Sequence, residues 1–134
     1  MNTDQARFNM IEQQIRPWEV LDPAVLSLLA RVRREDFVPP AARALAFFDT
    51  EIPLAEGGSD GRIMLSPKVE ARLLQNLLLS RTNRVLEIGA GSGFMAALLA
   101  HQARQVLSLE IDPQLAETAQ RNLKRAGLAN AQVR

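Results

Sequence analysis

The chain has 134 residues, of which 47% are hydrophobic and 23% are charged, a balance typical of one globular domain and not of a disordered or low-complexity chain. Lys and Arg number 16 against 15 Asp and Glu, and a net charge of +1 argues against a strongly basic nucleic-acid-binding protein. The absence of cysteine excludes disulfides, zinc–thiolate sites and a cysteine nucleophile, and the single histidine, His101, argues against a histidine-rich metal site and a Ser-His-Asp hydrolase.

Residues 1–65 are predicted to form an N-terminal helical segment followed by a loop. Apolar residues at helical spacing predict a helix over residues 4–15, which Pro17 should end. Asp22 and Pro23 are typical of the start of a second helix. The apolar face of this helix should contain Val25, Leu28, Leu29 and Val32.

The remainder of this segment shows no helical period. Residues 33–40 end in two prolines and predict a turn, and the glycines within residues 55–62 predict a loop. The arginine cluster of Arg31, Arg33 and Arg34 is expected to lie on a solvated face.

Residues 66–134 alternate between helices and strands. Ser66 and Pro67 predict the start of a helix. Its apolar stripe should consist of Val69, Leu73, Leu74, Leu77 and Leu78. The next predicted elements are a strand over 84–88, a helix over 94–102, a strand over 105–110, a helix from Pro113 that ends before Gly127, and a third strand from Ala131. This order predicts right-handed parallel crossovers and a sheet buried on both faces, so the fold class is α/β with a Rossmann-like core.

The motif that carries chemistry lies between the first of these strands and the following helix. It spans residues 87–94 and reads Glu-Ile-Gly-Ala-Gly-Ser-Gly-Phe. Its three glycines allow a sharp turn and a close approach of the backbone to a ligand. The start of the next helix offers backbone N–H groups to a carboxylate or a phosphate. We therefore predict a ligand site here, the alternative being a tight strand-to-helix turn that binds nothing.

The residues next to the three glycines distinguish between classes of ligand. A P-loop needs Gly-Lys-Ser/Thr after the turn, and Phe94 and Met95 stand there instead, which excludes a nucleoside triphosphatase. Phe94 also replaces the third glycine of the usual dinucleotide motif, and the Glu87 carboxylate would repel a pyrophosphate. A cationic ligand fits better, because S-adenosyl-L-methionine has an ammonium and a sulfonium group that Glu87 can attract. A nicotinamide-dependent oxidoreductase stays open as a disfavoured alternative.

A second acidic residue marks the end of the next strand. Glu110 follows Gly89 by 21 residues, at the place where an acid can accept hydrogen bonds from both ribose hydroxyls, the alternative being an ordinary surface acid. Asp112 is expected to cap the following helix instead of binding a ligand. No metal ligands are predicted. The predicted cofactor-binding residues are Glu87, Gly89, Ala90, Gly91, Ser92, Gly93, Glu110 and Ile111.

Several segments together form a pattern that covers nearly the whole chain. They are Met10 to Ile15, Val25-Leu26, Arg34-Glu35-Asp36-Phe37-Val38-Pro39, Ala46 to Asp49, Ile52 to Leu54 and the loop from Glu87 to Gly93. In these segments the chain resembles the protein-L-isoaspartate O-methyltransferases, a family of class I S-adenosylmethionine-dependent methyltransferases. The glycine loop is shared by all class I methyltransferases, whereas the Arg-Glu-x-Phe-Val-Pro pattern is the specific part.

The resemblance implies an enzyme that transfers a methyl group from S-adenosyl-L-methionine to the carboxylate of isoaspartyl residues in damaged proteins. The partners are then proteins or peptides that contain isoaspartyl residues. Such a carboxylate is already ionised near pH 7 and the sulfonium is already activated, so no general base is required. The enzyme would act by positioning and desolvation, and no catalytic residue can be named.

The chain departs from the family pattern before the helix at Pro67. The family has Gly-Gln-Thr-Ile-Ser-x-Pro there, with the Thr and Ser beside the methyl acceptor. In this sequence Ile63 stands at the Thr position and Leu65 at the Ser position, and Ser66 is better explained as a helix N-cap. A related protein that binds the cofactor but has another acceptor, or none, is therefore an alternative.

The resemblance also implies a longer sheet than this chain supplies. Class I methyltransferases have seven strands, and the chain stops as its third strand starts, so we expect residues 66–134 to form the first half of the cofactor-binding domain. The strand over residues 85–88 would keep an unpaired apolar edge, and missing crossover helices would leave one face of the sheet in water. These 134 residues should therefore be marginally stable or self-associate. Because no signal peptide and no run of about 18 apolar residues is present, we also expect a cytoplasmic protein that does not bind membranes.

Overall fold

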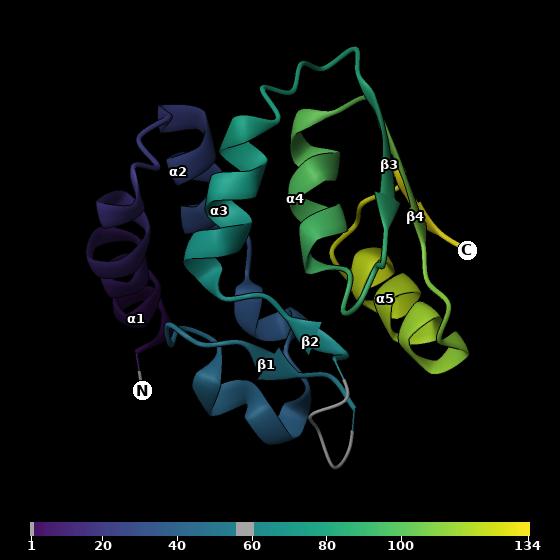
Figure 1. Cartoon of the computed structure of the whole chain (residues 1–134), viewed down its shortest axis with the longest axis horizontal. Coiled ribbons are helices and arrows are strands. Elements are labelled where there is room, and N and C mark those ends of the chain that lie inside the picture. The colour runs from purple at the N-terminus through teal and green to yellow at the C-terminus, as the bar shows by residue number, and fades with distance from the viewer. Residues whose placement is uncertain (1, 56–60) are drawn as a thin grey trace.

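The computed structural model describes residues 2–55 and 61–134. Figure 1 shows the N-terminal helices on one side, helix α4 in the middle, and strands β3 and β4 on the other side. The N-terminus and the C-terminus lie on opposite sides of the molecule (Figure 1).

The first predicted helix is present, but it changes type along its length. Helix α1 spans Thr3–Met10 and continues as a π-helical turn over Ile11–Ile15 and a 3₁₀ turn over Arg16–Trp18. The predicted end of the helix at residue 15 is confirmed, and Pro17 lies in the separate 3₁₀ turn that follows. Proline fits the first positions of the 3₁₀ turn, where its missing N–H group costs no hydrogen bond.

The second predicted helix is confirmed together with its cap. Helix α2 spans Pro23–Arg31, and Asp22 accepts a hydrogen bond from Ala24 N at 2.8 Å. Of the predicted apolar face, Val32 follows the helix and is half-buried. The buried members are Val25, Leu28 and Leu29.

The predicted turn over residues 33–40 is wrong, because this stretch contains a 3₁₀ helix over Arg34–Phe37 and the start of another over Pro40–Leu45. The arginine cluster divides accordingly. Arg31 and Arg33 are exposed, whereas only 1% of the Arg34 surface is exposed. Arg34 can be buried because its guanidinium group finds acceptors inside the protein.

Two short strands follow that the sequence did not predict. Strand β1 spans Ile52–Pro53 and pairs antiparallel with β2, Ile63–Met64, so that Ile52 lies opposite Met64. Two residues are too few to show an alternating pattern. Of the predicted loop over 55–62, residues 56–60 lie outside the described part of the chain.

Helix α3 spans Pro67–Asn76, but its predicted apolar stripe is wrong in part. Leu74 is buried, while Leu73, Leu77 and Leu78 are exposed and Val69 is half-buried. The buried face consists of Pro67, Glu70, Ala71 and Leu74. A charged residue can occupy this face because Glu70 forms an ion pair with Arg34.

The strands and helices of the second half agree closely with the sequence pattern. The strands are β3, Arg84–Ile88, β4, Gln105–Leu109, and β5, Ala131–Val133. The connecting helices are α4, Phe94–Gln102, and α5, Pro113–Arg125, and Gly127 follows α5 with a positive φ of 75°. The three strands are parallel in the order β3-β4-β5, which confirms the α/β fold with a Rossmann-like core.

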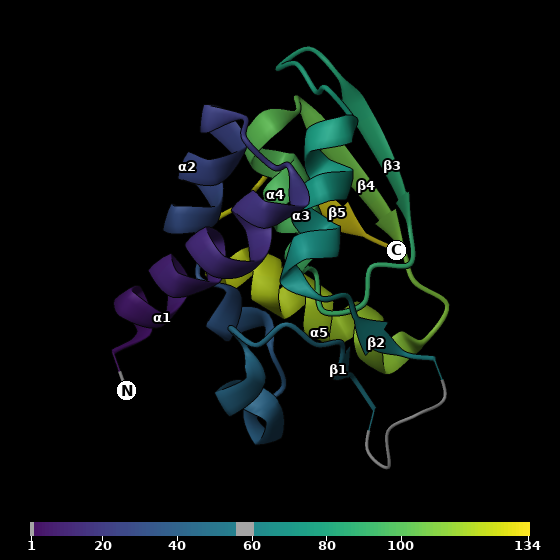
Figure 2. The same ribbon diagram turned by 60° about the vertical axis from the view of Figure 1, so that its left-hand side comes forward.

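Helix α4 forms the centre of the core. Residues 96–100 are all buried, as expected for a helix that is apolar around its whole circumference. Figure 2 shows α4 between the N-terminal helices and the strands. Within the described residues, no helix combines the length and apolar character needed to cross a membrane.

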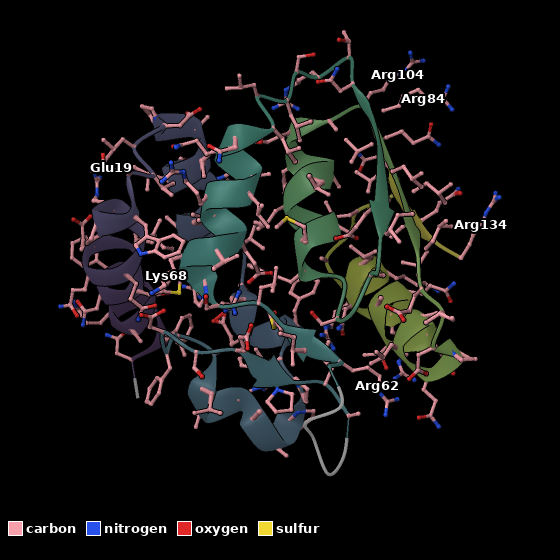
Figure 3. All side chains as sticks on the ribbon, in the orientation of Figure 1. Glu19, Arg62, Lys68, Arg84, Arg104 and Arg134 are labelled. Carbon is pink, nitrogen blue, oxygen red and sulfur yellow. The ribbon has the colours of Figure 1, made fainter. Side chains whose placement is uncertain are left out.

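The general expectation of a parallel sheet buried on both faces is not met here, whereas the expectation that missing crossover helices leave one face of the sheet in water is confirmed. The order β3-β4-β5 advances in one direction, so two right-handed crossovers place α4 and α5 on the same face. On the other face Leu86 is 60% exposed and Ile88 is 75% exposed. Figure 3 shows Arg84 and Arg134 projecting away from the helices on this side.

Candidate functional site

The glycine segment forms a tight turn between the carboxyl end of β3 and the start of α4. Gly89 and Gly93 have φ values of 92° and 89°, in the left-handed region that side chains rarely tolerate. A Cβ atom on Gly93 would lie 3.2 Å from the backbone oxygen of Ala119, so this glycine lets α4 pack against α5. A Cβ atom on Gly89 would meet no atom within 4 Å. The backbone at Gly89 is therefore open to a ligand.

Glu110 holds this turn from the end of the neighbouring strand. One carboxylate oxygen accepts a hydrogen bond from Gly91 N at 2.9 Å, and the other accepts one from Asp112 N at 3.0 Å. The structure thus brings the two predicted parts of the site together. It also gives Glu110 a role in shaping the loop that the sequence did not predict.

Glu87 lies on the covered face of the sheet, next to the turn. In the sheet register it is opposite Ser108, whose hydroxyl donates a hydrogen bond to Glu87 Oε1 at 2.6 Å. Burial raises the pKa of Glu87 to about 7, and the negative charges of Glu70 and Glu110 add to this rise. The hydrogen bond from Ser108 opposes it.

A buried ion pair behind the turn was missed at the sequence level. Arg34 pairs with Glu70, and it also donates to the carbonyl oxygens of Ala46 at 2.7 Å and Leu65 at 2.9 Å. Its guanidinium group lies 5.0 Å from the centre of the Phe94 ring, at the start of α4. Burial raises the pKa of Glu70 to about 7 although Arg34 lowers it. Arg34 therefore ties the N-terminal segment to both α3 and the glycine turn.

The other predicted site residues differ in exposure. Ile111 is 98% exposed beyond β4, so an apolar side chain is available next to Glu110. Ala90 and Ser92 are buried, and the carbonyl of Ser92 accepts a hydrogen bond from Asn122. These two residues are better suited to fix the turn than to contact a ligand through their side chains.

The two helix caps predicted beside the site have different outcomes. Asp112 caps α5 by accepting a hydrogen bond from Gln114 N at 2.9 Å and also pairs with Arg62, which confirms the prediction. Ser66 stands at the N-cap position of α3, but its side chain makes no capping hydrogen bond. The predicted cap is therefore right in position and wrong in its hydroxyl contact, because the buried Ser66 starts the helix through its backbone carbonyl.

The segment that precedes α3 is apolar at Ile63 and Leu65, the two positions where the family has Thr and Ser. Ile63 is paired in β2, and Leu65 is half-buried and fixed through its carbonyl by Arg34. Among residues 2–55 and 61–134, no group of His, Asp and Glu side chains is arranged to hold a metal ion.

Signals for the missed residues were present but weak. Ser108 interrupts an otherwise apolar strand, and Glu70 interrupts the buried face of α3. A polar residue inside an apolar pattern indicates a partner, but the sequence alone does not say which one.

Comparison with known proteins gives matches over most of the chain. A family model described as protein-L-isoaspartate(D-aspartate) O-methyltransferase matches residues 5–134. The chain is 37% identical over 129 residues to the protein-L-isoaspartate O-methyltransferase of Herpetosiphon aurantiacus, which covers 96% of this chain and 56% of that protein. It is 42% identical over 114 residues to protein-L-isoaspartate O-methyltransferase 2 of Syntrophobacter fumaroxidans, covering 85% of this chain and 44% of that protein.

Solved structures show the same fold. A Plasmodium falciparum protein-L-isoaspartate O-methyltransferase in complex with S-adenosyl-L-homocysteine superposes with a TM-score of 0.74 at 19% identity, covering 100% of this chain and 62% of that chain. Another protein-L-isoaspartate O-methyltransferase gives a TM-score of 0.72 at 23% identity, with 98% of this chain and 41% of that chain covered. The chain spans about half the length of the curated relatives it matches. Because the family model matches it almost from end to end, the chain belongs to the protein-L-isoaspartate(D-aspartate) O-methyltransferase family.

Proposed function

We propose that this chain binds S-adenosyl-L-methionine and forms part of an enzyme that methylates the carboxylate of isoaspartyl residues in damaged proteins. The observation that carries the proposal is the open backbone at Gly89, flanked by the carboxylates of Glu87 and Glu110. The family membership of the chain and the cofactor product bound in the Plasmodium falciparum relative support the choice of cofactor.

The residues of the turn fit such a cofactor. Gly89 lacks the Cβ atom that would fill the space beside the turn, and α4 begins directly after the turn at Phe94. The first turn of a helix suits a carboxylate. Glu87 offers a negative charge to an ammonium or sulfonium group. Glu110 follows β4, the position from which an acid holds a ribose in folds of this kind, and the exposed Ile111 offers an apolar surface to a base.

The contribution of this chain to the reaction is to position the cofactor. When bound, S-adenosyl-L-methionine supplies a methyl group that is already activated by a positive sulfur. Glu87 and the backbone of the turn would orient that end of the molecule, while Glu110 fixes the turn through Gly91. An isoaspartyl carboxylate is ionised near pH 7, so the chain needs no general base.

The apolar segment before α3 favours a second candidate. Ile63 and Leu65 supply no hydroxyl group for an acceptor carboxylate, and a carboxylate buried without hydrogen bonds is costly. A cofactor-binding enzyme with a different acceptor is the function this observation would favour. A nicotinamide-dependent oxidoreductase is disfavoured by the acidic environment of the turn.

Two measurements on the full-length protein separate these functions. Calorimetry with S-adenosyl-L-homocysteine and with NAD tests the cofactor, and binding of NAD alone would refute the proposal. Methyl transfer to an isoaspartyl peptide, with the matching aspartyl peptide as control, tests the acceptor.

We expect weak isoaspartyl turnover for the natural sequence and a higher rate for the double variant Ile63→Thr/Leu65→Ser, because the variant restores the two hydroxyl groups. Rapid turnover by the natural sequence would show that other residues hold the acceptor. A cytoplasmic location, and the absence of nucleic-acid and membrane partners, stay predictions from the sequence.

A further inference from the structure

Ser108 is a polar residue in a place where the fold does not require one. It lies near the carboxyl end of β4 between two leucines, and none of its surface is exposed. Its hydroxyl donates a hydrogen bond to Glu87 Oε1 at 2.6 Å, across the pair that the sheet register sets. A buried hydroxyl is costly unless it is bonded, and this bond is the one that compensates it.

We propose that Ser108 is a positioning residue for Glu87, fixing one carboxylate oxygen and stabilising the ionised side chain so that its charge can receive the cationic end of the cofactor. This inference rests on the proposed function, since the ligand is the cofactor proposed there. Within the described residues, the second oxygen of Glu87 has no hydrogen-bond partner and stays available.

The surroundings of Glu87 explain why such a donor matters. Glu70 on α3 and Glu110 at the end of β4 are both acidic, and they disfavour a further negative charge. The cation Arg34 pairs with Glu70 and not with Glu87. In the described part of α4 the one titratable residue is His101, which lies in the last turn, away from the glycine turn. Ser108 is thus the group that opposes burial and repulsion at Glu87.

The hydrogen bond from Ser108 favours the ionised form of Glu87, and this determines the direction in which the pKa of Glu87 changes when the bond is lost. Ser108 donates to the carboxylate and so lowers a pKa that burial raises to about 7. Without the hydroxyl, the pKa of Glu87 rises further and the side chain becomes mostly neutral at pH 7. A cationic ligand then loses its partner, and its affinity recovers only at higher pH.

The first test uses the full-length protein without cofactor. Carboxyl ¹³C NMR titration should give a higher pKa for Glu87 in Ser108→Ala than in the natural sequence, and an unchanged pKa in Ser108→Thr, which keeps the hydroxyl. Val106→Ala is the matched control, because Val106 is equally buried on the same face of the same strand. If Ser108→Ala does not fold, Ser108→Cys, whose thiol is a weaker donor, should raise the pKa by a smaller amount.

The second test is the pH dependence of S-adenosyl-L-methionine binding, because this ligand carries both the ammonium and the sulfonium charge. The midpoint of the affinity profile should move to higher pH in Ser108→Ala, with about a fivefold loss at pH 7 for a pKa rise of about one unit, and should not move in Val106→Ala. A merely structural serine would change stability without moving this midpoint.

The outcomes separate the inference from the proposed function. An unchanged pKa of Glu87 in Ser108→Ala overturns the inference even if the cofactor binds. A raised pKa with an unmoved binding midpoint overturns it as well. If the natural sequence binds no S-adenosyl-L-methionine at any pH, the proposed function fails, and with it the part of the inference that concerns the cofactor.

Discussion

Replacing Arg34 by alanine should destabilise this fold more than any exposed arginine replacement. Arg34 is buried and makes hydrogen bonds to two backbone carbonyls, of Ala46 and Leu65, besides its ion pair with Glu70. Removing it leaves a buried carboxylate without its cation. The loss expected for breaking a buried ion pair in this way is about 3–5 kcal/mol.

Two further effects act on this figure in opposite directions. Each carbonyl that loses its donor adds a cost of about 1 kcal/mol or more where water does not replace the bond. Protonation of Glu70 limits the total, because a neutral carboxyl group is cheaper to bury than a carboxylate. Because these two effects oppose each other, the expected decrease in the free energy of unfolding for Arg34→Ala is about 3–5 kcal/mol.

The pH dependence provides a sharper test than the magnitude. The pKa of Glu70 in the folded protein is about 7, above its ordinary value, so folding favours the protonated form. The stability it contributes is present at low pH and is lost as the pH rises through 7. Since Arg34 lowers this pKa, its removal raises it further, and the deficit of Arg34→Ala should be larger at pH 8 than at pH 5.

Urea unfolding followed by far-UV circular dichroism at both pH values measures this. Arg33→Ala is the matched control, because Arg33 is adjacent in sequence but exposed and pairs only at the surface with Asp36. The control should lose less than about 1 kcal/mol. A loss below about 1 kcal/mol for Arg34→Ala, or an equal deficit at both pH values, would refute the reasoning about this buried pair.

Three other predictions concern the glycine turn and the sheet edge. Glu110→Ala should weaken S-adenosyl-L-homocysteine binding in the full-length protein by about 2–3 kcal/mol by calorimetry, with a smaller loss for Glu110→Gln, and an unchanged dissociation constant would contradict the site assignment. Gly91→Val should abolish binding but leave the helices folded. Valine rarely adopts the φ of 54° at Gly91, and its Cβ atom would lie 3.2 Å from Leu54, so the turn would shift away from the conformation that opens Gly89 to a ligand. Loss of the circular dichroism signal would make Gly91 structural instead. The 134-residue chain alone should self-associate in light scattering through its exposed apolar strand edge, and a stable monomer that binds the cofactor with micromolar affinity would count against this.

The second half of the fold could be predicted from sequence because its signals are local. The strand over 84–88 and the helix over 94–102 have the predicted bounds, and Gly127 follows α5 with a positive φ as its position after that helix predicts. The glycines at the turn also follow from backbone conformation alone. Each of these features depends on residues within a few positions of one another.

The predictions that were wrong depend on contacts between distant segments. Nothing in the sequence near Arg34 indicates that Glu70, 36 positions away, will bury its charge. The apolar stripe of α3 was misplaced for the same reason, because the pairing of Glu70 turns Glu70 and Ala71 toward the core and leaves Leu73 and Leu77 exposed. Strands β1 and β2 are held by pairing across a connection and not by their own pattern.

The position of the glycine turn relative to the open edge has a consequence for any measurement of binding. Gly89 follows Ile88 directly, and Ile88 is 75% exposed on the edge strand β3. Parallel sheets normally bury both faces, and an exposed apolar row of this kind is typical of a surface that contacts further protein. The curated relatives, of which the chain spans about half, contain additional residues that could supply such cover. Whatever covers β3 also borders the turn, so the affinity for S-adenosyl-L-homocysteine should be lower for the 134 residues alone than for the full-length protein.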